Sequence, residues 1–94
     1  MKKYSRDIEA VIGILKTYGA KKIILFGSAS KGNLRKESDL DFACEGIKPE
    51  EFFKVHGKLL ASSHRRIDLI DLKDAKKTLR KKVEQEGIVL YDAH

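Results

Sequence analysis

The fold of this sequence is decided by two short stretches, Leu25-Phe26-Gly27-Ser28 and, after ten further residues, Asp39-Leu40-Asp41-Phe42. The first stretch ends a β-rich run over 22–26 that a glycine stops, which predicts a buried strand. The second alternates polar and apolar residues over 39–44, which is the period of a half-buried strand. Residues two apart on a strand share a face, so we expect the two aspartates on one side and their apolar neighbours in the core.

Helical and strand patterns alternate along the rest of the chain. Helices are predicted over 5–18, over 49–60 and over 73–86, and further strands over 66–71 and 88–91. The buried face expected for the second helix is Phe52, Phe53, His56, Leu59 and Leu60, and for the last helix Ala75, Leu79 and Val83. Alternating strands and helices predict an α/β (α+β) fold, a single domain over residues 1–94 with helices packed on a small sheet.

Composition excludes several classes of protein. Hydrophobic residues at 41% and charged residues at 36% are typical of a soluble globular domain. The longest apolar run covers only residues 23–26, against roughly 20 for a membrane span, and no apolar stretch follows the basic N-terminus, so a cytoplasmic protein is expected. One cysteine, Cys44, excludes an internal disulfide, and the histidines lack zinc-site spacing. The net charge of +6 favours anionic partners such as nucleotides or RNA.

Three aspartates are the candidate metal ligands. Asp39 and Asp41 on one strand face repel each other unless a cation sits between them, and carboxylate oxygens suit Mg²⁺. Asp68 completes a three-carboxylate cluster if its strand neighbours the first. Asp71 has the opposite parity and is expected to end its strand or cap the last helix. The alternative for Asp39 and Asp41 is an exposed sheet face, although aspartate is a poor strand former.

The Gly27-Ser28 turn is the candidate phosphate site. Glycine lets the backbone approach a ligand closely, and N–H groups that open a helix bind anions. Ser28 adds a hydroxyl at the same place. A strand followed by Gly-Ser is also common as a plain turn, and no P-loop or Gly-x-Gly-x-x-Gly sequence is present.

Taken together, these pieces resemble the signature of the DNA polymerase β-like nucleotidyltransferases. Residues 27–43, GSASKGNLRKESDLDFA, are similar to the pattern of the minimal nucleotidyltransferases, near GSxARGxxxxxSDxDL. The family's third carboxylate lies in an apolar-Asp-apolar strand, which Ile67-Asp68-Leu69 matches, and residues 87–91, GIVLY, resemble its last strand. The resemblance implies a small mixed sheet flanked by helices, the nucleotidyltransferase fold.

The resemblance also implies residue roles. Gly27 and Ser28 would hold the triphosphate of an incoming nucleotide, with ATP as the donor. Asp39 and Asp41 would bind two Mg²⁺ ions, and Asp68 would help to bind the ion that activates the attacking hydroxyl. Lys31 stands where the family pattern has arginine; it keeps the charge but loses the planar fork that binds phosphate through two hydrogen bonds.

Free-standing minimal members resemble antitoxins that act on a HEPN-domain ribonuclease toxin. The resemblance therefore implies a nucleotidyltransferase that transfers AMP to a hydroxyl, such as a tyrosine, of a HEPN-type partner. One alternative is a non-catalytic subunit that neutralises its partner by contact alone. Another is a nucleic-acid binder that uses the basic residues of the last helix, Lys73, Lys76, Lys77, Arg80, Lys81 and Lys82, although no aromatic residues interleave with them. The sequence leaves homo- or hetero-oligomerisation open.

Overall fold

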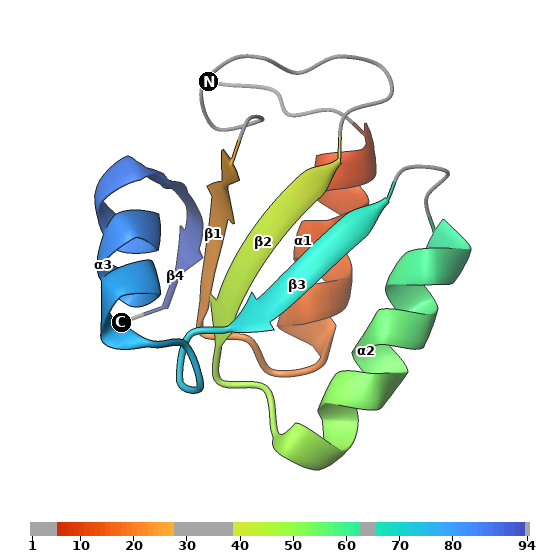
Figure 1. Ribbon diagram of the computed structural model, residues 1–94. Helices are drawn as coiled ribbons and strands as arrows, with labels where there is room; N and C mark the ends of the chain where they lie inside the picture. The colour runs from red at the N-terminus through yellow and green to blue at the C-terminus, as the bar shows by residue number, and fades with distance from the viewer. Residues whose placement is uncertain (1–5, 28–38, 63–65, 94) are drawn as a thin grey trace.

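The computed structural model describes residues 6–27, 39–62 and 66–93. The elements in chain order are α1 (Arg6–Thr17), β1 (Lys22–Phe26), β2 (Leu40–Glu45), α2 (Pro49–Ser62), β3 (Ile67–Asp71), α3 (Lys77–Glu86) and β4 (Ile88–Asp92). The strands form one sheet in the order β3-β2-β1-β4 (Figure 1). β2 is parallel to β3, whereas β1 is antiparallel to β2 and to β4. The predicted α+β fold with a mixed sheet is confirmed.

Helices cover both faces of this sheet. On one face α1 and α2 bury the larger core, whose members include Ile8, Val11, Leu15, Phe42, Cys44, Val55 and Leu59. On the other face Val83 of α3 packs with Ile24, Ala43 and Leu72. Because this second core is small, the same face leaves room for polar side chains at one end of β2 and β3. No helix in the described ranges has the length and apolar character needed to cross a membrane.

The buried face of α2 differs from the prediction. Val55 and Leu59 are its buried residues, whereas Phe53 is 88% exposed and Leu60 is 79% exposed. Phe52 and His56 are half-buried. Two adjacent apolar pairs, at 52/53 and 59/60, allow a helix to present either of two faces, and packing on α1 and the sheet selects the face that carries Val55.

The last helix also begins later than predicted, at Lys77, because residues 72–75 form a turn. Asp71 ends β3, as expected, and its Oδ1 accepts a hydrogen bond from the backbone N–H of Lys73 at 2.9 Å. The Arg80 guanidinium donates from Nε to the carbonyl of Leu72 at 3.0 Å. This contact holds the turn against α3, so Arg80 is partly engaged within the fold. Of the predicted inner stripe, Val83 is buried but Leu79 is 40% exposed.

Replacing Gly87 with alanine is expected to destabilise the protein by about 1–3 kcal/mol, the typical cost of overpacking. A Cβ at this junction of α3 and β4 would lie 2.5 Å from the carbonyl oxygen of Val83 and 3.1 Å from that of Leu25. Both are backbone atoms, which cannot move aside by changing rotamer. Urea unfolding measures the loss.

Gly13→Ala is the matched control, because a Cβ on that helical glycine meets nothing within 4 Å. It is expected to stabilise α1 by up to about 1 kcal/mol through helix propensity. Equal stability of the Gly87→Ala protein and the wild type would contradict the close packing of α3 on β1.

Candidate active site

Two of the predicted carboxylates meet across neighbouring strands. Asp41 on β2 pairs in register with Asp68 on β3 and with Phe26 on β1. In-register neighbours direct their side chains to the same face of a sheet. Leu40 and Phe42 are fully buried on the opposite face, as the alternation predicts. One end of the sheet, at the top of Figure 1, is therefore formed by the start of β2, the start of β3 and the end of β1.

The carboxylate of Asp41 is held in an unfavourable electrostatic environment. Burial raises the pKa of Asp41, and the negative charges of Asp68 and Asp39 raise it further. Protonated Asp41 also donates a hydrogen bond to the Asp68 carboxylate, which favours its neutral form. Asp39 lies directly before β2 and is exposed. The neutral form of Asp41 is therefore favoured where these carboxylates converge.

Arg66 supplies a positive charge beside the pair. Its Nε lies 3.8 Å from Oδ1 of Asp68, and the two side chains are 75% and 50% exposed. An ion pair this exposed contributes little to stability. The charge of Arg66 does offset part of the negative charge at this end of the sheet. Arg66 is missing from the predicted site because a single arginine ahead of a strand carries no motif.

Gly27 lies directly against Asp41. Its φ of +74° falls in the left-handed region that favours glycine. A Cβ added there would come within 3.2 Å of Cγ of Asp41 and closer still to one of its oxygens. The glycine therefore makes room for the carboxylate at the end of β1. The other predicted phosphate-binding residues, Ser28 and Lys31, lie outside the described residues.

The donor set suits a hard divalent cation, because all three candidate ligands offer carboxylate oxygens and two of them lie in register on neighbouring strands. Within residues 6–27, 39–62 and 66–93, no group of three or more histidine, cysteine, aspartate or glutamate side chains is arranged to hold a metal ion. Asp41 and Asp68 are brought together, and Asp39 is near enough for its charge to act on Asp41. The assignment of the three as metal ligands stays a prediction.

Solved structures share this fold. A chain from a toxin–antitoxin crystal structure with AMP-PNP is 26% identical with a TM-score of 0.78, over 94% of this chain and 74% of that chain. A chain from a variant of the MntA–HpeT toxin–antitoxin is 25% identical with a TM-score of 0.76, over 96% and 74%. A chain from the tri-AMPylated Shewanella oneidensis HEPN toxin in complex with MNT antitoxin is 24% identical and shares the fold, with a TM-score of 0.71 over 92% and 70%.

Sequence comparison gives two results. Comparison with curated protein sequences yields no match. The family model described as polymerase beta, nucleotidyltransferase, matches residues 9–94, which include Gly27 and all three candidate aspartates. Together with the mixed sheet and the carboxylate pair at one end of its strands, this match places the chain in the polymerase β-like nucleotidyltransferase family.

Proposed function

We propose that this protein is a Mg²⁺-dependent nucleotidyltransferase that transfers AMP from ATP to the hydroxyl group of a tyrosine on a HEPN-type toxin. In this way it acts as the antitoxin of that toxin. The observation that carries the proposal is the in-register pair of Asp41 and Asp68, with Gly27 placed against it. Two carboxylates forced together are costly unless a cation joins them. In a nucleotidyltransferase, that arrangement serves phosphoryl chemistry.

The residues divide into a metal end and a phosphate end. Asp39, Asp41 and Asp68 would hold Mg²⁺, which when bound neutralises phosphate charge and stabilises the attacking and leaving oxygens of an in-line displacement. Gly27 ends β1 beside Asp41 without a side chain, and the triphosphate would lie against its backbone. Lys31 would add a point charge to the phosphates and not a bidentate contact.

The proposed reaction is a single displacement at the α-phosphorus of ATP. The hydroxyl oxygen of the acceptor forms a bond to that phosphorus, and the bond to the bridging oxygen of the β-phosphate breaks. Pyrophosphate leaves, and the hydroxyl proton passes to a carboxylate of the site or to solvent. The acceptor then carries AMP through a phosphodiester bond.

The choice of AMP and of a HEPN partner is supported by the related structures. One is a toxin–antitoxin with AMP-PNP, an ATP analogue, and another is a tri-AMPylated HEPN toxin with its MNT antitoxin. The nucleotide supports ATP as the donor here, and the modified toxin supports a protein hydroxyl as the acceptor. We expect the reaction to take place in the cytoplasm.

Incubation of the protein with ATP, Mg²⁺ and its HEPN-type partner is expected to add one or more AMP units to the partner. Intact-mass spectrometry of the partner measures the addition, and peptide mapping locates the modified hydroxyl. Omission of ATP, or chelation of Mg²⁺ with EDTA, should leave the partner mass unchanged. An unmodified partner that is still inhibited would contradict the enzymatic proposal and favour neutralisation by contact alone.

A further inference from the structure

The outer face of α2 carries apolar side chains that the fold does not use. Phe53 is 88% exposed and Leu60 is 79% exposed, and their spacing of seven residues places them on one side of the helix. Gly57 lies between them on that side, and a Cβ there would meet nothing within 4 Å. A glycine inside a helix weakens it, and no packing contact among the described residues requires one here. This face is therefore open to close approach by another molecule.

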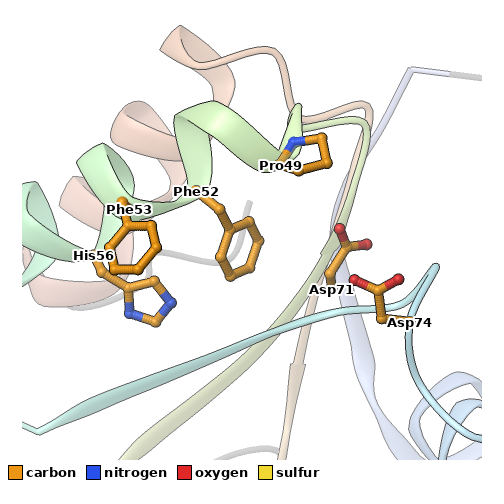
Figure 2. Close-up of a pocket in the computed structure, with 6 residues that line it drawn as sticks. All are labelled: Pro49, Phe52, Phe53, His56, Asp71 and Asp74. Atoms are coloured by element: carbon orange, nitrogen blue, oxygen red, sulfur yellow. The ribbon is translucent and has the colours of Figure 1, made fainter.

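A pocket opens at the N-terminal end of this face. Its volume is about 510 Å³, and its lining residues are Pro49, Phe52, Phe53, His56, Asp71 and Asp74. Figure 2 shows aromatic rings from α2 along one side and the two carboxylates, from the end of β3 and the following turn, at the other. The rings of Phe52 and His56 are in contact, with centroids 5.1 Å apart and planes tilted by 57°. The pocket thus combines aromatic surface with negative charge.

The charge of this pocket is opposite to that of the chain. The protein has a net charge of +6, yet no lysine or arginine of the described residues lines the pocket. Within the described ranges, neither Asp71 nor Asp74 forms an ion pair, and the side chain of Asp71 accepts a hydrogen bond from the backbone N–H of Lys73. The positive end of the α2 dipole is met by Glu50 and Glu51 in the first turn. The pocket therefore favours a cation.

We propose that this pocket binds an arginine side chain of a partner protein, whose neighbouring residues lie on the face of α2 that carries Phe53, Gly57 and Leu60. A guanidinium is the cation that both stacks on aromatic rings and pairs with carboxylates through a planar fork. Phe53 and Leu60 lie about 10 Å apart along the helix, which is longer than one side chain and fits a protein segment. That the partner is the substrate toxin rests on the proposed function.

The position of the pocket suits this role. β3 is the edge strand of the sheet and carries Asp68 near its start and Asp71 at its end, on opposite faces. The two residues are three apart, or about 10 Å along a strand. A partner docked beside Asp71 would lie at one end of the edge strand β3. It would leave uncovered the candidate active site at the other end of that strand. Docking and transfer then depend on different residues and are separable by mutation.

The chemistry of the pocket is tested without any partner. N-acetyl-L-arginine methylamide is titrated into the ¹⁵N-labelled protein, with the citrulline analogue as a neutral probe of the same shape. Amide shifts at millimolar arginine are expected over residues 50–56 and 71–74. The citrulline analogue, or a protein with Asp71→Asn and Asp74→Asn, is expected to give shifts about tenfold smaller at equal concentration, because a charged hydrogen bond is lost. Equal shifts with both probes would overturn arginine recognition.

Docking is tested with the HEPN-type partner by calorimetry and by AMP transfer. Phe53→Ala is expected to weaken binding about tenfold or more, as for a central aromatic contact, with kcat unchanged at saturating partner. Leu79→Ala removes an exposed leucine from α3 and is the matched control; its binding should equal the wild type. Unchanged affinity of the Phe53→Ala protein would overturn the docking site.

Two outcomes separate this inference from the proposed function. If the wild-type protein binds the partner through Phe53 but transfers no AMP, the proposed function fails and the docking site stands. If AMP is transferred and Phe53→Ala changes only self-association in sedimentation, the occupant is a second copy of this chain and the inference fails.

Discussion

Asp41→Asn is expected to lower AMP transfer about a hundredfold or more, while the folded protein becomes no less stable than the wild type. Asparagine keeps the shape of the side chain but removes the charge that a divalent cation requires. It also removes repulsion, because Asp41 sits half-buried beside Asp68 and within the field of Asp39. Steady-state transfer, with partner modification measured by mass spectrometry, gives the loss of rate.

The stability of this variant should depend on pH in a defined direction. Burial and the neighbouring carboxylates raise the pKa of Asp41 in the folded protein above that of an unfolded aspartate, about 3.9. The folded wild type therefore binds the proton more tightly, and stability that is present below the unfolded pKa is lost as pH rises through the folded pKa. Asparagine does not titrate, so its advantage over the wild type should grow from acid to neutral pH.

Urea unfolding of the wild type and of the Asp41→Asn protein at acid and at neutral pH, in buffer without Mg²⁺, checks this expectation. Glu84→Gln, which neutralises an exposed carboxylate on α3, is the matched control and should leave both activity and pH dependence unchanged. If the Asp41→Asn protein unfolded more easily at neutral pH than the wild type, that result would contradict an unfavourable electrostatic environment for the Asp41 carboxylate. Full activity in that variant would remove Asp41 from the catalytic site.

The strands could be predicted from sequence because their signal is local. The alternation around Asp41, with Leu40 and Phe42 buried, follows directly from the period of a strand. Pairing with Asp68 is not local: it needs β3 to lie parallel to β2 with Asp68 opposite Asp41, and the whole of α2 separates the two strands in the chain. Sequence spacing makes Asp68 a candidate, and only the sheet order places it beside Asp41.

The two errors on the helices have separate physical causes. In α2, apolar residues surround more of the helix than one face can bury, so periodicity does not decide between the face of Phe53 and that of Val55. The surplus apolar residues are those of the proposed docking surface. Before α3, a turn is held by two hydrogen bonds that helical periodicity does not reveal. The carboxylate of Asp71 accepts the backbone N–H of Lys73, and Arg80 donates to the carbonyl of Leu72.

Gly27→Ala is expected to reduce AMP transfer about a hundredfold and to destabilise the fold by about 1–2 kcal/mol. The stability loss comes from the left-handed backbone at φ +74°, which costs that amount for a residue with a Cβ. The activity loss has a different cause, since the new methyl group would push against the Asp41 carboxylate, 3.2 Å from its Cγ. Transfer assays and urea unfolding measure the two effects separately.

Two variants separate backbone strain from crowding of the site. Gly19→Ala carries the strain alone, because φ there is +98° and its Cβ would lie at an ordinary 3.8 Å from the carbonyl oxygen of Gly46. It should lose similar stability and keep its activity. Gly27→Asn relieves part of the strain, since asparagine tolerates this conformation, but keeps the Cβ against Asp41. It should regain stability without regaining transfer. If Gly27→Ala lost stability but transferred AMP normally, Gly27 would be a turn residue only, and the space that it leaves beside Asp41 would have no part in catalysis.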